Sequence, residues 1–223
     1  MAATRRRAPA KKRQSSRKVI RLDNDARRAQ LLAMGRRAFA SHSYDEVSID
    51  ELARKAKISK GLFYYYFPTK RDLYIAGLRD TGSDLVAKLI SVPRDLAPRP
   101  RAMAAVDAYL THVAQQGPAF MALMRGGVGS DPKVSEVIER IRLGILDELM
   151  RGPAIGAMLR SRPLARLALR GWIGMVEATS IEWLGSGGDS REVVCELLVD
   201  MLFATLTRVL TPKDAARLGQ ASG

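Results

Sequence analysis

Apolar residues recur along most of this chain at the three- and four-residue spacing of an amphipathic helix. The pattern predicts a first helix that begins after Asp23 and ends near Ser41. Its apolar positions are Leu31, Leu32, Met34, Ala38 and Phe39. The alternating pattern typical of strands is not found, so the sequence predicts an all-α protein.

Hydroxyl side chains predict where the next two helices start. Ser48 precedes Glu51 by three residues, which is the capping-box spacing, and predicts a short second helix. Ser59 follows a tight turn and predicts a third short helix that ends at about Tyr66.

The remaining helices are separated by Gly and Pro. Thr69 is expected to cap a long fourth helix, which ends before a loop that contains Pro93, Pro98 and Pro100. The later helices are predicted over residues 101–116, 118–125, 132–151, 163–184 and 190–210.

Charge is distributed unevenly along the chain. Residues 1–21 hold nine basic and no acidic side chains within a formal net charge of +14, and they have few large apolar residues. We expect a disordered basic arm there, because so polar a segment cannot bury enough surface to fold. A polyanion is its expected partner, and a solubilising tail is the alternative. Two domains are expected after the arm, over residues 22–75 and 76–215.

Several classes of protein are disfavoured by the composition. No apolar run reaches the roughly 20 residues of a membrane span, and acidic residues rather than an apolar stretch follow the basic start. We therefore expect a cytoplasmic protein. Cys195 is the single cysteine, and His42 and His112 are the two histidines. This set disfavours a metal site or a histidine triad, so no cofactor and no catalytic residue are expected.

The segment from Ser48 to Lys70 has the pattern of a helix-turn-helix. Its two short helices share the apolar residues Ile49, Leu52, Ala53, Ile58, Leu62 and Phe63. In such a unit the start of the second helix meets base edges in the major groove of double-stranded DNA. The residues expected to do so are Ser59, Lys60, Gly61, Tyr64 and Tyr65.

Two further side chains are expected to contact phosphate groups. Ser48 and Lys70 lie at helix N-termini, where partial positive charge favours an anion. Simple capping and a solvated charge are the alternative readings of these positions. Consecutive tyrosines cannot all face one partner, so Tyr66 and Phe67 are expected in the core, whereas Tyr64 and Tyr65 face DNA.

This stretch resembles the tetracycline-repressor (TetR) family of bacterial regulators. The resemblance covers about 50 residues and lies in Phe39, Tyr44, Ser48-Ile49, Leu52-Ala53, Ile58-Ser59-Lys60-Gly61, Tyr64, Tyr66-Phe67 and Lys70-Arg71-Asp72-Leu73. It implies the same seven DNA contacts, a palindromic operator and, by default, repression.

The sequence departs from the family at three positions. Ser43 and Lys57 stand where the family often has Gly, at loop positions that favour left-handed backbone geometry. Tyr65 stands where the family often has His, which leaves the base preference open.

The C-terminal part is expected to form the dimer interface and to bind an effector. The resemblance to the family implies a homodimer built on the last two long helices, which in this chain are predicted over residues 163–184 and 190–210. The first carries the small residues Gly171, Gly174 and Ala178, and the second has a broad apolar surface. Burial within one subunit is the alternative.

Mixed Met and aromatic positions between the two ends are typical of a cavity for a small hydrophobic or acyl-type effector. The lining is predicted to include Tyr109, His112, Phe120, Met121, Met124, Ile138, Ile141, Trp172 and Met175. An ordinary core is the alternative for each of them.

Two other functions remain to be compared with a sequence-specific regulator. The basic arm would suit an architectural protein that binds DNA without regard to sequence, although the helix-turn-helix argues against it. An enzyme is disfavoured because no glycine-rich phosphate loop and no nucleophile with an adjacent base are found, and Glu177 and Glu182 are expected at a helix interface.

Overall fold

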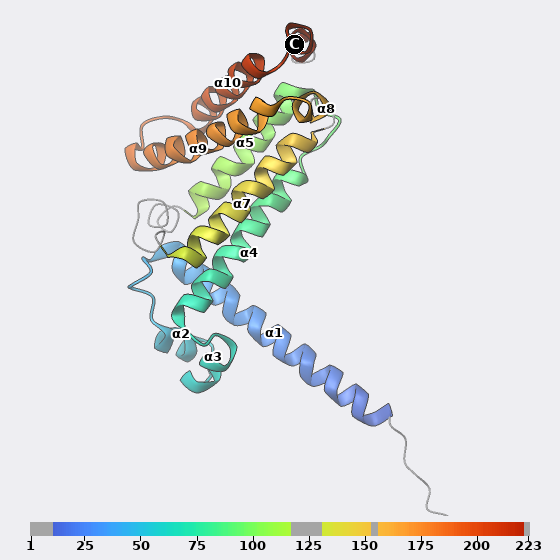
Figure 1. The fold of residues 1–223 in the computed structure, drawn as a ribbon. Helices are drawn as coiled ribbons and strands as arrows, with labels where there is room; N and C mark the ends of the chain where they lie inside the picture. Colours follow the sequence, from blue (N-terminus) through green and yellow to red (C-terminus); the bar gives the residue numbers. More distant parts are fainter. Residues whose placement is uncertain (1–10, 117–130, 153–155, 221–223) are drawn as a thin grey trace, which may run out of the picture.

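A computed structural model describes residues 11–116, 131–152 and 156–220, and within these ranges it contains helices and no strand (Figure 1). The prediction of an all-α fold is confirmed. The helices are α1 (Lys11–Ser41), α2 (Ile49–Lys55), α3 (Lys60–Tyr66), α4 (Lys70–Ile90), α5 (Pro98–Gln115), α7 (Pro132–Arg151), α8 (Gly156–Arg160), α9 (Pro163–Ser186), α10 (Arg191–Val209) and α11 (Pro212–Gln220).

The three predicted N-caps of α2, α3 and α4 are present. Ser48 Oγ accepts from Glu51 N at 3.4 Å, Ser59 Oγ from Leu62 N at 3.1 Å, and Thr69 Oγ1 from Asp72 N at 3.0 Å. Each bond satisfies a backbone donor that has no partner inside the helix. The caps thus fix where the short helices of the N-terminal domain begin.

Helix α1 begins much earlier than the sequence pattern indicates. It starts at Lys11, so residues 11–21, expected to be disordered, are helical in the structure. Arg, Lys and Gln are good helix formers, and extending an existing helix avoids the cost of nucleating one. This part of α1 points away from the other helices (Figure 1). Residues 1–10 of the expected arm lie outside the described residues.

The N-terminal domain is built around a buried aromatic and aliphatic cluster. Phe63, Phe67, Leu31 and Leu73 are almost completely buried and hold α1, α2, α3 and α4 together. The cluster continues into α7, whose buried residues include Val134 and Val137. Helix α4 therefore belongs to both domains, and the predicted boundary after residue 75 falls inside it.

The C-terminal core joins α5, α7, α9 and α10. Leu110, Leu146, Leu169 and Leu198 are nearly inaccessible to solvent. Trp172 Nε1 donates to Leu198 O at 3.0 Å, which ties α9 to α10. Cys195 is a buried, unbridged core residue, as expected.

Some helix boundaries differ from the predictions. Helix α5 begins at Pro98, which was expected in a loop, because proline fits the first position of a helix. Helices α8 and α11 were not predicted, and the predicted helix 118–125 lies outside the described residues. None of the helices in the described part of the chain is long and apolar enough to span a membrane.

Candidate nucleic-acid interface and ligand cavity

Helices α2 and α3 form the predicted helix-turn-helix at one end of α4 (Figure 1). Within the turn, Lys57 has a φ of 56°, the left-handed value expected for a position where Gly is common. Ile58 N then bonds to Ala53 O at 3.1 Å and closes the turn. By contrast, Ser43 does not have a positive φ, and its N–H and hydroxyl both donate to Glu46 Oε2 at 2.8 Å.

Helix α3 presents one face to the core and the other to solvent. Phe63 is 0% exposed and fixes the helix, whereas Tyr64 is 37% and Tyr65 70% exposed. An added Cβ at Gly61 would find no atom closer than 4.0 Å, so the backbone there is open to a partner. These three residues lie where the sequence predicted a DNA-reading surface.

Tyr66 lies at the edge of the core. Phe67 is buried as predicted, but Tyr66 is only partly buried, and its hydroxyl donates to Asn24 Oδ1 at 3.1 Å. A phenol needs a partner for its hydroxyl, and this bond supplies one on α1. Tyr66 thus joins α3 to α1 and does not face outward with Tyr65.

Lys60 is paired in the free protein. Its Nζ lies 2.8 Å from Asp50 Oδ1, and the hydrogen bond to Asp50 raises the pKa of Lys60 above its ordinary value. Both side chains are more than half exposed, so the pair contributes little to stability and is readily exchanged for another anion. Lys60 and Tyr64 are four residues apart and share one face of α3.

Lys70 at the start of α4 is held against the loop before α2. Its Nζ donates to Asp45 O at 3.0 Å and lies 4.8 Å from the ring centroid of Tyr44. Ser48 caps α2, which agrees with simple capping, the alternative interpretation of this residue.

Two sets of ion pairs connect the N-terminal helices to the rest of the protein. Arg71 donates from Nε and Nη2 to the two carboxylate oxygens of Asp131, each at 2.5 Å. This contact lowers the pKa of Asp131 to about 2. Arg36 of α1 bonds to Asp80 and Asp84 of α4. These pairs tie α1 to α4, and the first turn of α4 to the start of α7.

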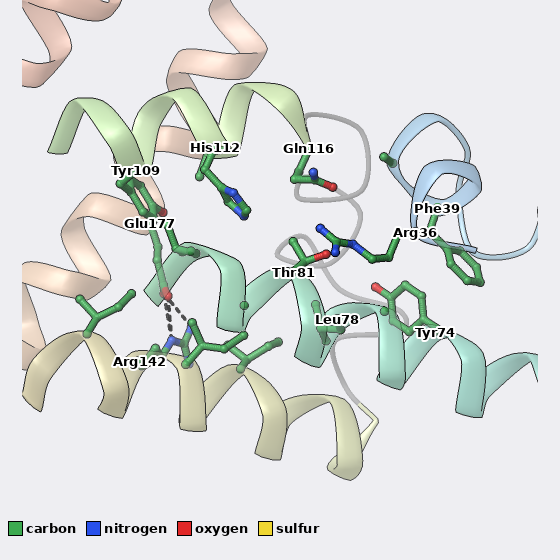
Figure 2. A pocket seen from close by; sticks show the side chains of 18 residues that line it. Arg36, Phe39, Tyr74, Leu78, Thr81, Tyr109, His112, Gln116, Arg142 and Glu177 are labelled. Atoms are coloured by element: carbon green, nitrogen blue, oxygen red, sulfur yellow. Dashed lines mark hydrogen bonds and ion pairs between the residues drawn. The ribbon is translucent and has the colours of Figure 1, made fainter. Parts of the chain in front are cut away.

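A cavity of about 120 Å³ lies between the N-terminal domain and the C-terminal core (Figure 2). Four of the predicted lining residues border it: Tyr109, His112, Ile138 and Ile141. Burial, reinforced by the nearby charge of Lys88, lowers the pKa of His112 to about 4. This histidine is therefore neutral near pH 7.

Apart from Tyr109 and His112, the polar groups of this cavity were not predicted. They include Arg36, Thr81, Gln116, Arg142 and Glu177. Glu177 and Arg142 form an ion pair across α9 and α7, with Nη2 2.6 Å from Oε2. The predicted helix-interface role of Glu177 agrees with this geometry. Because these groups come from five separate segments, no local spacing could have revealed them.

A second cavity of about 150 Å³ lies within the C-terminal domain. Trp172 and Tyr109 border it, as does a largely aliphatic wall from α5, α7, α9 and α10. Met175 packs against the C-terminal core and borders neither cavity, so its predicted lining role is not seen. The predicted lining residues Phe120, Met121 and Met124 lie outside the described residues.

Helices α9 and α10 expose an apolar face at the opposite end of the molecule from α3 (Figure 1). Its large exposed side chains are Leu164, Leu167, Val193, Leu197 and Met201. On α9 it continues over Gly171 and Gly174, where an added Cβ would meet nothing within 4 Å.

Two family models match this chain. The model described as "Bacterial regulatory proteins, tetR family" matches residues 31–76, and the model described as "Tetracyclin repressor-like, C-terminal domain" matches residues 98–205. The first contains the helix-turn-helix, and the second spans α5 to α10.

Curated relatives are regulators of transcription. The activator FasR of Mycolicibacterium smegmatis is 28% identical over 125 residues, which are 56% of this chain and 57% of FasR. The regulator EthR of the same organism is 37% identical over 60 residues, 27% of this chain and 28% of EthR. The chain thus matches less than two thirds of either protein. The repressor AcnR of Corynebacterium diphtheriae is 26% identical over 186 residues, 79% of this chain and 89% of AcnR.

Solved structures share the fold. A TetR-family regulator from Streptomyces coelicolor is 28% identical with a TM-score of 0.75, and the match covers 88% of each chain. FadR from Bacillus subtilis, solved in complex with stearoyl-CoA, is 15% identical with a TM-score of 0.63 and coverage of 78% of this chain and 96% of FadR.

Proposed function

Because the chain belongs to the TetR family of bacterial regulatory proteins, we propose that it is a ligand-responsive repressor that binds a palindromic operator as a homodimer. The observation that carries this proposal is the outward face of α3. Tyr64 and Tyr65 are exposed on a helix that Phe63 anchors in the core, beside Lys60 and the open backbone of Gly61. A rigid helix with exposed polar and aromatic groups at its start suits major-groove recognition.

The remaining predicted contacts support the same orientation. Ser48 and Lys70 lie at the starts of α2 and α4, where backbone N–H groups and the helix dipole favour a phosphate. On binding, Lys60 exchanges Asp50 for the DNA, and Lys70 exchanges Asp45 O for a phosphate oxygen.

The homodimer is proposed to form through α9 and α10. Large apolar side chains exposed side by side on two packed helices are unfavourable in water, and a second copy related by a two-fold axis would cover both sets at once. The bare backbone at Gly171 and Gly174 permits close helix approach. The result would be a four-helix interface that presents two copies of α3.

The effector is proposed to bind in the two cavities between these ends. Their walls are mostly apolar with few polar groups, as is usual for ligand pockets. A hydrophobic or acyl-type molecule fits such walls, and a ligand that favours one spacing of the two α3 helices would change operator affinity.

The test is selection of bound sequences from a random DNA pool, followed by affinity measurements on the selected site. We expect one palindromic site. The double variant Lys60→Ala with Tyr64→Ala should lose at least tenfold in affinity for it, because each lost base contact costs about 1 to 3 kcal/mol. Lys133→Ala, which removes an exposed charge from α7, serves as the control and should bind normally.

The same measurement distinguishes an architectural DNA-binding protein. Uniform affinity for all sequences, with a steep salt dependence that the double variant shares, would contradict the proposed repressor and favour that alternative.

A further inference from the structure

The two cavities adjoin at a polar neck. Tyr109 of α5, Ile145 of α7 and Glu177 of α9 border both of them. In the first cavity Tyr109 and Glu177 lie at one end, whereas Phe39 and Tyr74 lie at the other (Figure 2). A single elongated molecule can therefore occupy both cavities by passing Tyr109.

The neck contains a hydrogen-bond donor without an acceptor. Tyr109 Oη is buried, and among the described residues no group forms a hydrogen bond of good geometry with it. The Ser180 hydroxyl lies near enough to lower the pKa of Tyr109 in part, but it donates its proton to Val176 O at 2.7 Å, and its oxygen does not meet the geometry of an acceptor for Tyr109 Oη. Burial still raises the pKa of Tyr109 well above its usual range, so the phenol keeps its proton. An unpaired buried donor is costly and indicates a place for an acceptor.

The charges around the first cavity are already balanced. Arg142 is paired with Glu177, and Arg36 is paired with two aspartates. His112 is neutral at pH 7. No cation described on this wall is left over for a carboxylate or a phosphate, so an uncharged ligand fits it best.

The second cavity has excess positive charge only at its outer end. There Glu148 accepts from Arg101 at 3.1 Å and from Arg94 at 3.4 Å. The Arg94 side chain is more than half exposed, so water screens its charge. The deeper wall, which includes Trp172, Val176 and Leu202, is apolar.

The volumes limit the size of each part of the ligand. An engineered apolar cavity of about 150 Å³ in another protein holds one benzene molecule. Cavities of about 120 and 150 Å³ therefore each accept an apolar group of roughly six carbons.

On the basis of the function proposed above, we propose that the ligand of this protein is an uncharged molecule with two apolar arms joined by a central carbonyl group, which accepts a hydrogen bond from Tyr109 Oη at the neck. One arm fills the first cavity and reaches Phe39 of α1, and the other fills the second cavity against Trp172. The ligand carbonyl supplies the acceptor that Tyr109 Oη lacks. Because the charged groups of the first cavity are already paired, a neutral molecule leaves none of them without a partner.

Two isomeric amides provide the test. N-hexylhexanamide has its amide between a five-carbon and a six-carbon chain, whereas dodecanamide has the same atoms with the amide at one end. Calorimetric titration of the full-length protein should show about tenfold tighter binding of the central amide. Tyr109→Phe should reduce that preference about fivefold, the usual effect of one lost hydrogen bond. Dodecanoate, with a terminal charge that Arg101 would attract, should bind more weakly than the central amide.

Tyr74→Phe is the matched control, because it removes a hydroxyl from the far end of the same cavity. It should leave the preference unchanged, and thermal unfolding verifies that both variants are folded. Equal binding of the two amides, tighter binding of dodecanoate, an unchanged preference in Tyr109→Phe, or no binding of either amide would each overturn the inference. Operator binding by the unliganded protein is measured separately, so failure of the DNA-binding function is distinguishable from failure of this ligand assignment.

Discussion

Lys57 shows how one residue can be strained in an otherwise regular turn. Its φ of 56° is unfavourable for a side chain with a Cβ, and Gly adopts it freely. We predict that Lys57→Gly raises the free energy of unfolding by about 0.5 to 1 kcal/mol, after the greater chain entropy of glycine is subtracted. Urea unfolding monitored by circular dichroism measures the change.

Ser43→Gly is the matched control for Lys57→Gly. Ser43 occupies the other position where the family often has Gly, but it lacks a positive φ and donates two hydrogen bonds to Glu46. The free energy of unfolding should therefore fall in this variant. A stabilised Ser43→Gly, or a destabilised Lys57→Gly, would show that backbone strain is not what distinguishes the two positions.

His112 makes stability depend on pH. Burial lowers its pKa in the folded protein to about 4, with Lys88 and Arg36 adding to the effect and Asp84 opposing it. The unfolded chain has a histidine pKa of about 6.5, so it binds more protons between these two values. The stabilisation from a neutral His112 is complete above pH 6.5 and is lost as the pH falls toward 4.

The corresponding variant is His112→Gln. The free energy of unfolding of the wild type should fall relative to this variant between pH 7 and pH 4, by up to about 3 kcal/mol. Parallel curves for wild type and His112→Gln would contradict the prediction.

Among the helices, the features that the sequence predicted correctly are those that depend on residues close together along the chain. The caps Ser48, Ser59 and Thr69 were predictable because each bonds to an amide three residues later. Helix α8 was not, because a five-residue helix has no apolar period to detect. The helical start of α1 was missed for another reason. Apolar periodicity reveals a helix only where one face of the helix packs against a core. A helix that extends away from the core does not need an apolar face, so no such pattern marks it.

The same distinction, between local spacing and tertiary packing, applies to the candidate sites. The exposed tyrosines of α3 were found because the spacing within one helix-turn-helix determines which residues face outward. Arg36, Arg142 and Glu177 were missed because tertiary packing alone brings them to the cavity. The neck at Tyr109 likewise depends on α5, α7 and α9 meeting at one place.

The exposed faces of α9 and α10 lead to a prediction about assembly. A charge at the centre of an apolar interface is costly to bury, so Leu167→Asp combined with Leu197→Asp should convert a dimer into a monomer. Sedimentation velocity at micromolar concentration measures the change. Leu143→Asp on α7, also an exposed leucine, is the control and should stay dimeric. A wild-type protein that sediments as a monomer would refute the dimer itself.

Across the whole molecule, α4 connects the helix-turn-helix end to the cavities that are proposed to bind the effector. Lys70 at its start contacts the loop before α2, and Thr81 and Leu85 in its middle border the first cavity. The Arg71–Asp131 pair adds a second connection, from the first turn of α4 to the N-cap of α7. These links tie the start of α4, next to the helix-turn-helix, to α7, so in the proposed dimer they should set the spacing of the two copies of α3.

Breaking the Arg71–Asp131 pair should therefore loosen that spacing without altering α3. Asp131→Asn removes the pair and leaves every positive charge in place. We predict that this variant binds the palindrome about fivefold more weakly, because two helix-turn-helix units that are held less firmly bind the two half-sites less cooperatively. Affinity for a single half-site should be unchanged. Inserting one base pair between the half-sites should harm the variant less than the wild type.

Fluorescence anisotropy with the palindrome, the half-site and the lengthened palindrome measures all three effects. Arg71→Gln should reproduce the relaxed spacing, and the double variant should add nothing, because both substitutions remove one interaction. Arg140→Gln breaks an exposed pair with Glu136 on the same helix and should behave as wild type. Equal loss of affinity for half-site and palindrome in Asp131→Asn would mean that the pair acts on α3 itself and not on the distance between the two copies.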